Sequence, residues 1–498
     1  MKGAIAASHP DTVAAGASIL AQGGNAIDAA VAAAFVSFVA EPVLTSIGGS
    51  GIAVVSNGEG QAATYDFFST MPSGEMTPTA DFRQITVDFG ATTQDFYIGR
   101  ASVAVPGAVA GLCLLAEREG TLPLPTLLAP AIRLASEGSL LTPFMAHTLR
   151  LLEPIFTNTQ EIAAVFAPGG RLLSAGARVR VPGLADLLTA VAEQGAAAFY
   201  QGPAAEAFSA DQQAHHGLVR AEDLAAYQAR VAEPLRVAYR EFEVLLPGYP
   251  STGGLWVALA LKHMARFDFS PTDFLSARHL HALADVMRAV EQANPGFPEE
   301  DGGAVSGKDF ARPSRGVGNT THISVMDATG TTVSITTTAG EAAGYIVPGT
   351  GIIPNNMLGE IDLHPNGFHR LPPGHRLTTM MTPAILLHRG RPVLAVGSGG
   401  SNRIRAAVFQ VLSHIVDFDR SLAAAVTAPR LHYQNGILQA EGGLPPESLK
   451  PLRAAGYRLN VWQEQSMYFG GANAVAYRGG KLEAAGDPRR GGETALVD

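Results

Sequence analysis

One abrupt change of pattern constrains this chain more than any other feature. Residues 296–318 are rich in Gly, Pro, Ser and charged side chains, which is typical of an exposed connector. Directly after it, THISVMD and TTVSITTT follow the period-two pattern of β-strands on either side of a turn at ATG. We therefore predict a β-hairpin that begins where a releasable connector ends, with Thr320 at the junction.

A threonine at such a junction can become a catalytic nucleophile. Its hydroxyl is unreactive in mid-chain, but cleavage of the preceding bond would free an α-amine with a pKa of about 8 beside that hydroxyl. The order Asn319-Thr320 at the end of the connector meets this requirement. The same local pattern also fits an ordinary edge strand, because β-branched residues favour strands.

The returning strand ends in three threonines, residues 336–338, which offer a second hydroxyl. A two-residue turn in the hairpin would place Thr337 opposite Thr320, whereas one extra, bulged residue would place Thr338 there. In either register a second hydroxyl can orient the first. A solvated strand face lined with threonines is the alternative interpretation.

The stretch VLAVGSGGSNRIRAAV predicts a strand, a glycine turn and a helix. Backbone N–H groups around Gly399, Gly400 and Ser401 would be exposed at the start of that helix, where they can bind an anion or the oxyanion of a tetrahedral intermediate. The turn lacks the Lys-Ser/Thr ending of a phosphate loop and fits the dinucleotide pattern poorly. A purely structural turn is the alternative.

The length and the Ala- and Gly-rich composition favour one large layered domain over two separate ones. Apolar residues spaced by three and four predict helices within residues 11–40, with a break at the glycine pair 23–24, and within 105–228, 279–293 and 403–416. Strands are predicted within residues 45–55 and 239–250, and in AILLHRG and PVLAVGSGG.

Composition also limits the partners. The net charge is −9 and no basic cluster is dense, so we do not expect nucleic acid as a partner. The single cysteine, Cys113, and the scattered histidines predict neither a disulfide nor a metal site, and we expect no cofactor. No stretch approaches the roughly 20 apolar residues that cross a bilayer, and residues 1–20 lack a signal-peptide pattern, so we expect a cytoplasmic protein without a membrane partner.

Along nearly its whole length the chain resembles the γ-glutamyltransferase (glutathione hydrolase) family of N-terminal nucleophile (Ntn) hydrolases. The combination of NTTHISV with GGNAIDAA is very specific. The resemblance also includes TSIGGSG, SVAVPGAVAGL, DLAAYQARV, the block NTTHISVMDATGTTVSITTT, NNM, GSGGSNRI, AVTAPRLH and GDPRRGG.

The resemblance implies an α/β (α+β) fold with the four-layer αββα sandwich of Ntn hydrolases. It implies self-cleavage between Asn319 and Thr320 into a large segment, 1–319, and a small segment, 320–498, which together form one intertwined domain and a heterodimer. It further implies an acyl-enzyme on the Thr320 oxygen and a hydrogen bond from Thr338 to the nucleophile. The amides of Gly400 and Ser401 would form the oxyanion hole, with a shift to residues 399–400 as the alternative.

Departures from the family pattern fall where the family binds its substrate. The arginine that pairs with the glutamyl α-carboxylate is replaced by Phe68 in YDFFSTMP. The two serines that hold the same carboxylate align with Thr379 and Met380, so one hydroxyl is kept and one is lost. A phenyl ring cannot replace a bidentate arginine, and Phe68 and Met380 suit an apolar acyl group.

Further departures follow the second threonine. Gly340 stands where the family has an asparagine, and the shortened block NNMLGE implies Asn356 as a substrate-binding residue and leaves Glu360 as the nearest candidate for the α-amino contact. Arg376 and Arg403 are candidates to replace the missing arginine.

Three functions follow from these observations. The first is a self-processing γ-glutamyl hydrolase or transferase, with hydrolysis favoured, that acts on small-molecule amides as a heterodimer or a higher oligomer of it. The second is a cephalosporin-acylase-like amide acylase for a non-glutamyl acyl group. The third is an unprocessed protein that only binds a small acid or amide.

Overall fold

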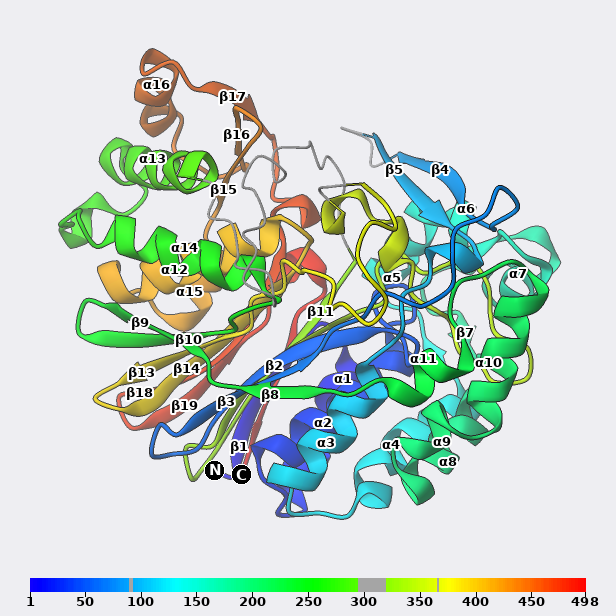
Figure 1. Ribbon diagram of the computed structural model, residues 1–498. Helices are drawn as coiled ribbons and strands as arrows, with labels where there is room; N and C mark the ends of the chain where they lie inside the picture. Colours follow the sequence, from blue (N-terminus) through cyan, green and yellow to red (C-terminus); the bar gives the residue numbers. More distant parts are fainter. Residues whose placement is uncertain (89–92, 294–318, 365–366) are drawn as a thin grey trace.

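The computed structural model describes residues 1–88, 93–293, 319–364 and 367–498. Two antiparallel sheets lie face to face, and helices cover the outer side of each, which gives the order helix, sheet, sheet, helix (Figure 1). The predicted αββα sandwich is confirmed. Both sheets contain strands from before and after Thr320, so the two segments of the chain share one core.

The predicted hairpin lies at the centre of the first sheet, which has seven strands. Every neighbouring pair in it is antiparallel. The order across this sheet is β20 (Glu493–Val497), β1 (Gly3–Ala7), β11 (Thr321–Asp327), β12 (Thr332–Thr338), β2 (Ser50–Ser56), β3 (Ala62–Phe67) and β8 (Arg230–Ala232).

The second sheet has six strands, also antiparallel, and contains both strands predicted before the glycine turn. Its order is β19 (Lys481–Ala485), β18 (Gly471–Arg478), β14 (Arg391–Gly399), β13 (Ala384–His388), β10 (Phe242–Leu246) and β9 (Leu235–Tyr239). The strand predicted within 239–250 is the second arm of the β9–β10 hairpin. Smaller sheets are formed by β15 (Leu431–Gln434), β16 (Ile437–Ala440) and β17 (Arg458–Val461), by β4 (Arg83–Asp88) and β5 (Thr93–Ile98), and by β6 (Ser139–Leu140) and β7 (Arg178–Val179).

The helices divide between the two outer layers (Figure 1). The layer on the seven-stranded sheet includes α1 (Pro10–Ala21), α2 (Ala26–Ala40), α3 (Ala108–Glu119) and α4 (Leu124–Glu137), extended by α5 (Pro143–Leu151), α6 (Glu153–Phe156), α7 (Gln160–Phe166), α8 (Leu184–Gln194), α9 (Ala197–Tyr200), α10 (Pro203–Ala214) and α11 (Ala221–Ala226). The other layer contains α12 (Thr252–Met264), α13 (Ala277–Ala293), α14 (Arg403–Phe418), α15 (Leu422–Thr427) and α16 (Pro446–Ala454).

Successive side chains of β11 face two different layers, as expected for a strand between a sheet and a helix layer. Ile323 and Val325 belong to the apolar core that includes α2. Ser324 faces the second sheet and donates from Oγ to the carbonyl oxygen of Asn473 in β18, 3.1 Å away. The alternation fixes which residues near the junction point between the sheets.

The register of the hairpin decides between the two predicted arrangements. Thr321 pairs with Thr337. The strands are joined by three loop residues, 328–330, and the last is a glycine with φ of 87°. Three-residue connections with glycine in the left-handed region are common in hairpins. The two-residue turn is therefore wrong, and Thr338 rather than Thr337 lies opposite Thr320.

A buried carboxyl group lies behind the hairpin, at the end of α2. Glu41 is fully buried, and the Thr12 hydroxyl of α1 donates to its Oε1 over 2.6 Å. Burial raises the pKa of Glu41 to about 7, although the hydroxyls of Thr12 and Thr321 lower it. In the folded protein Glu41 therefore keeps its proton at pH values where an exposed glutamate has lost it.

Glu41→Gln is expected to flatten the pH dependence of stability. In the unfolded chain this carboxyl group ionises near 4.5, but in the folded protein only near 7. The folded state thus binds the extra proton between these values, and the free energy of unfolding falls as pH rises through them, by up to about 3 kcal/mol. Glutamine stays neutral and can still accept the bond from Thr12.

Urea unfolding at about pH 5 and about pH 8 measures this effect. Glu59→Gln on the exposed surface is the matched control and should keep the wild-type pH dependence. An unchanged pH dependence in Glu41→Gln would contradict the role given to Glu41.

Candidate active site

Thr320 lies where β11 begins, and only 5% of it is exposed. The end of β14 passes directly beside it. A Cβ atom at Gly399 would come within 2.2 Å of the Thr320 carbonyl oxygen, so only glycine fits there. This close approach brings the glycine turn after β14 against the candidate nucleophile.

The hydroxyl of Thr338 contacts the peptide bond that precedes Thr320. Its Oγ1 donates to the carbonyl oxygen of Asn319 over 2.6 Å and accepts from the Gly340 N–H over 3.0 Å. The Gly340 bond leaves the hydroxyl proton directed at the Asn319 carbonyl. A donor in this position polarises that carbonyl toward attack by a nucleophile.

The predicted glycine turn separates β14 from α14. Gly400 and Ser401 have φ of 128° and 50°, and neither backbone N–H donates a hydrogen bond to another described residue. Asp362 holds the turn from outside, because its Oδ2 accepts from Ser401 Oγ at 2.9 Å and from Asn402 Nδ2 at 3.1 Å. Two unengaged amides at a helix start are suited to an oxyanion.

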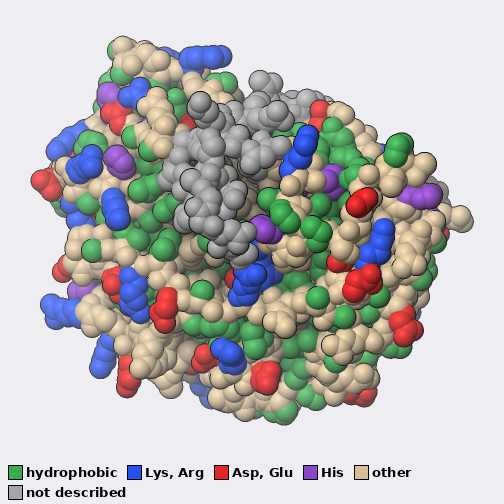
Figure 2. Space-filling model, viewed as in Figure 1, with side chains coloured by type: hydrophobic (Ala, Val, Ile, Leu, Met, Phe, Trp, Pro, Cys, Tyr) green, Lys and Arg blue, Asp and Glu red, His purple; other side chains and the backbone are tan. Residues whose placement is uncertain are grey.

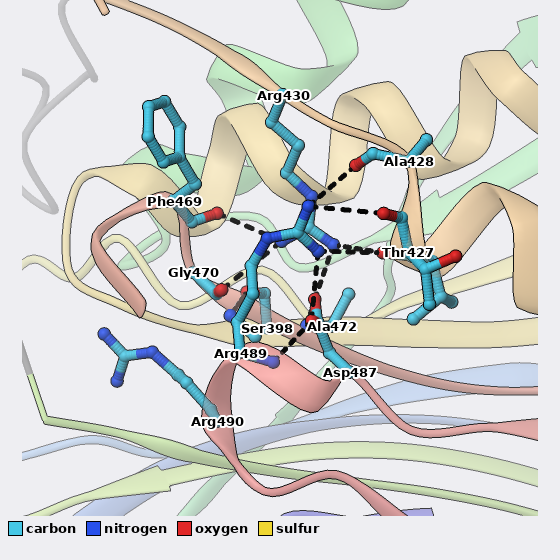
Figure 3. A network of polar contacts seen from close by, with 12 residues as sticks. Ser398, Thr427, Ala428, Arg430, Phe469, Gly470, Ala472, Asp487, Arg489 and Arg490 are labelled. Carbon is cyan, nitrogen blue, oxygen red and sulfur yellow. Dashed lines mark hydrogen bonds and ion pairs between the residues drawn. The ribbon is translucent and has the colours of Figure 1, made fainter. Parts of the chain in front are cut away.

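A buried ion-pair network anchors the strand beside this turn (Figure 3). Burial would raise the pKa of Asp487, but Arg430 and Arg489, at 2.6 and 3.0 Å, hold it below its usual value. Asp487 also accepts from the Ala472 N–H over 2.9 Å, and Arg430 donates to the Gly470 carbonyl oxygen over 3.3 Å. These bonds fix the start of β18, which pairs with the end of β14.

Two carboxyl groups lie near the junction. Burial raises the pKa of Glu341 to about 8, although the nearby backbone of Asn319 and the charges of Arg490 and Arg403 lower it. Burial, and then the charge of Glu341, raise the pKa of Glu360 well above its usual value. A Cβ atom at Gly340 would lie 2.3 Å from both Glu360 Oε1 and Asn356 Oδ1. The glycine at position 340 therefore makes room for these two side chains.

Asn356 already uses both ends of its amide within the protein. Its Oδ1 accepts from the Glu341 N–H over 2.7 Å, and its Nδ2 donates to the Tyr97 carbonyl oxygen over 3.3 Å. In this structure Asn356 positions Glu341, and its direct contact with substrate stays a prediction.

The other predicted substrate-binding residues lie in or beside the apolar core that the six-stranded sheet forms with α12, α13 and α14. Phe68 is buried in that core. Thr379 Oγ1 accepts from the Met381 N–H over 3.2 Å, and the sulfur of Met380 accepts from the Thr252 hydroxyl over 3.2 Å. Their roles in binding stay predictions.

The two candidate replacement arginines differ sharply. Arg376 lies 2.9 Å from Asp66 and donates to the Phe68 carbonyl oxygen at 2.5 Å and to the Tyr227 hydroxyl at 2.7 Å, so its guanidinium is occupied. Arg403 is fully buried, and none of its three side-chain nitrogens has a hydrogen-bond partner. Of the two, only Arg403 has a guanidinium without a hydrogen-bond partner.

His322 lies between the sheets with both ring nitrogens engaged. Its Nδ1 is 2.8 Å from Thr336 Oγ1, and its Nε2 is 2.9 Å from Ser324 Oγ. Burial lowers the pKa of His322 to about 3, so the ring is neutral. Its place supports the strand pairing rather than proton transfer at Thr320.

Sequence reasoning missed two acidic residues of this region. Glu341 lies three residues after Thr338, at the end of the returning strand of the hairpin. An acidic residue so close to the hairpin could have been recognised from the sequence. Asp362 gave no such signal, because its partner Ser401 lies 39 positions away and only the fold joins them.

On the face in Figure 2, basic and acidic side chains are interspersed. Across the described ranges, no group of three or more His, Cys, Asp and Glu residues could hold a metal ion. A helix long and apolar enough to cross a membrane was not found in the same ranges.

Comparison with known sequences gives a consistent result. Residues 12–296 and 299–497 match the family model described as gamma-glutamyltranspeptidase. The chain is 33% identical over 507 residues to the acylase ACY 1 proenzyme of Pseudomonas sp. (strain V22), with 96% of this chain and 90% of that protein covered. It is 31% identical over 546 residues to the glutathione hydrolase proenzyme of Pseudomonas aeruginosa, with 99% and 94% covered.

Comparison with solved structures points to the same family. The crystal structure of cephalosporin acylase from Bacillus halodurans matches with a TM-score of 0.86 at 27% identity, covering 100% of this chain and 96% of the other. The γ-glutamyltranspeptidase of Helicobacter pylori matches with a TM-score of 0.52 at 30% identity, covering 58% and 82%. With the sandwich, the hairpin and the glycine turn in place, this chain belongs to the γ-glutamyltranspeptidase family of Ntn hydrolases.

Proposed function

We propose that this chain is a precursor that cuts itself between Asn319 and Thr320 and then uses the freed Thr320 to hydrolyse acyl amides. The observation that carries the proposal is the 2.6 Å hydrogen bond from the Thr338 hydroxyl to the Asn319 carbonyl oxygen. It places a donor on the bond to be cut, next to a buried hydroxyl nucleophile.

In self-cleavage, Thr320 Oγ1 attacks the carbonyl carbon of Asn319 while Thr338 stabilises the charge on its oxygen. The peptide nitrogen leaves as the amine of Thr320, and an ester joins Asn319 to the threonine oxygen. Water then hydrolyses the ester, which yields the Asn319 carboxylate and a free Thr320 with its hydroxyl restored. The two segments stay together because their strands share both sheets.

In turnover, the α-amine of Thr320 accepts the hydroxyl proton as the oxygen attacks the substrate carbonyl. The amides of Gly400 and Ser401 stabilise the oxyanion, and the amine product leaves with a proton. Water resolves the acyl-enzyme and releases the acid. We place hydrolysis before transfer to an amine, because the two curated relatives are named a hydrolase and an acylase.

The acyl group is γ-glutamyl or a related acid, and an acylase for non-glutamyl groups is the second candidate. Phe68 at the arginine position and the occupied guanidinium of Arg376 favour the second candidate. The similarity to the acylase proenzyme and to the cephalosporin acylase structure supports it as well.

Thr320→Ala is expected to stay intact, because it lacks the attacking hydroxyl. Mass spectrometry should find only the full chain of 51.8 kDa in the variant and two fragments in the wild type. Thr321→Ala, which changes the next residue, should still be cut. Cleavage of Thr320→Ala at the same bond would show that an outside protease acts instead.

Thr338→Val is expected to slow self-cleavage at least about 10-fold, because the scissile carbonyl loses its hydrogen-bond donor. Thr337→Val is the matched control, since Thr337 bonds Thr45 instead. The appearance of the fragments over time measures both rates. Equal rates in the two variants would remove Thr338 from the mechanism.

Processed wild-type protein is expected to release 4-nitroaniline from γ-glutamyl 4-nitroanilide, and Thr320→Ala is not. A fully processed sample that leaves this compound intact but cleaves another acyl anilide would assign the acylase activity instead. Processed protein that cleaves no acylated aniline would contradict the proposed function.

A further inference from the structure

Before cleavage, the chain lacks the base that the processed chain uses. The nitrogen of Thr320 still belongs to a peptide bond, so no α-amine exists to accept the proton of the Thr320 hydroxyl. The same nitrogen must gain a proton when its bond to Asn319 breaks. A group beside this bond must therefore move one proton from the hydroxyl oxygen to the nitrogen.

Glu341 places a carboxyl group beside this bond. Only 1% of the residue is exposed, and neither Oε1 nor Oε2 has a hydrogen-bond partner among the described residues. Its backbone is held in place, because its N–H donates to Asn356 Oδ1 over 2.7 Å. The carboxyl group lies near the backbone of Asn319, which carries the carbon that Thr320 attacks. A buried polar group without a partner is unfavourable for folding and calls for a functional explanation.

The other carboxyl groups around the hairpin are less suited to this task. The charge of Glu341 raises the pKa of Glu360 further, so Glu341 loses its proton first. Asp362 already accepts two hydrogen bonds from the glycine turn. Glu41 lies on the other side of the hairpin, where it accepts from α1.

The His322 ring and the Thr338 hydroxyl are engaged elsewhere. Both ring nitrogens of His322 lie within hydrogen-bond distance of hydroxyl groups, and burial lowers its pKa to about 3, so the ring holds an extra proton poorly. Thr338 directs its proton at the Asn319 carbonyl oxygen. Of the groups compared, Glu341 alone combines a free acceptor with a place beside the bond.

We propose that Glu341 is the proton acceptor of self-cleavage, so that its carboxylate takes the proton of Thr320 Oγ1 and passes it to the nitrogen of Thr320. As the proton leaves, Oγ1 forms its bond to the Asn319 carbonyl carbon. When the nitrogen gains the proton, the carbon–nitrogen bond breaks, and the ester and the carboxylate remain. This inference rests on the proposed function and adds its base. The bond that is cut belongs to the same chain, so the buried carboxyl group needs no opening to the solvent.

The surroundings of Glu341 set the pH range in which it can act. The titratable and charged groups that face it are Arg490, Arg403, Asp362 and Glu360. Burial has the largest effect and raises the pKa of Glu341 to about 8, whereas the Asn319 backbone and the two arginines lower it. Since only the ionised form accepts a proton, wild-type cleavage should speed up about 10-fold per pH unit below about pH 7 and level off above about pH 8.

Glu341→Gln is expected to slow cleavage at least about 100-fold at pH 8, because glutamine has a similar shape but cannot accept the proton. The remaining rate should follow the hydroxide concentration and rise with pH without levelling off. Precursor made in a cell-free reaction and transferred to buffers from about pH 6 to about pH 9 is followed by mass spectrometry. A wild-type rate and pH profile in Glu341→Gln would overturn the assignment.

Glu41→Gln is the matched control. It also removes a buried carboxyl group with a raised pKa, but on the helix side of the hairpin. It should keep the wild-type rate and the levelling above about pH 8. The same loss in both variants would attribute the profile to stability and overturn the role of Glu341.

Hydroxylamine separates formation of the ester from its hydrolysis. It cleaves an ester at Thr320 and leaves a hydroxamate at the end of residues 1–319, which mass spectrometry identifies. Glu341→Gln should yield no hydroxamate, because the ester does not form. Rapid formation of the hydroxamate in this variant would place Glu341 in the hydrolysis step and overturn the proposed transfer.

If urea unfolding shows that Glu341→Gln does not fold, Glu341→Asp carries the test. Aspartate keeps the carboxyl group, so the cleavage profile should still level off, at a lower rate. A profile that never levels off would overturn the assignment.

Two results separate this inference from the function on which it rests. Wild-type cleavage in Glu341→Gln, with Thr320→Ala intact, would overturn the role of Glu341 alone. Cleavage of Thr320→Ala at the same bond would overturn both.

Discussion

The site depends on the register between β11 and β12. A shift of one residue would turn each side chain of a strand to the other face of its sheet. In the observed register, Thr338 reaches the Asn319 carbonyl, whereas Thr337 points to Thr45. Pairing with β1 on one side and β2 on the other holds the hairpin in place. The position of the Thr338 hydroxyl thus depends on strand pairing across the sheet.

The second requirement is the contact between the two sheets. Gly399 lets β14 approach Thr320 so closely that no side chain could be accommodated. The ion pairs of Asp487 with Arg430 and Arg489 anchor β18, which pairs with β14. Backbone amide groups that a glycine turn holds in place do not depend on which acyl group binds. The hairpin and the glycine turn fit the family pattern, whereas the positions predicted to bind the substrate depart from it.

Charges near the junction are treated in two ways. Arg430 and Asp487 neutralise each other within the fold, whereas Arg403 and Glu341 are buried without an ion-pair partner. Paired charges fix the relative positions of their side chains, whereas an unpaired buried charge raises the free energy of the folded protein. Strained or unsatisfied groups are expected where function, rather than stability, has set the choice of residue.

The sequence by itself determined the α1–α2 helix pair, the hairpin and the glycine turn, because local periodicity and turn residues specify each of them, whereas the order of the sandwich layers followed from the family resemblance. It also indicated Thr320 as the candidate nucleophile, and it limited the hydroxyl opposite Thr320 to that of Thr337 or Thr338. The tertiary structure chose Thr338 through the three-residue turn. It also showed that Arg376 is occupied, whereas Arg403 is unpaired. These outcomes depend on contacts between residues far apart in the chain, such as Arg376 with Phe68, and such contacts leave no local pattern to read.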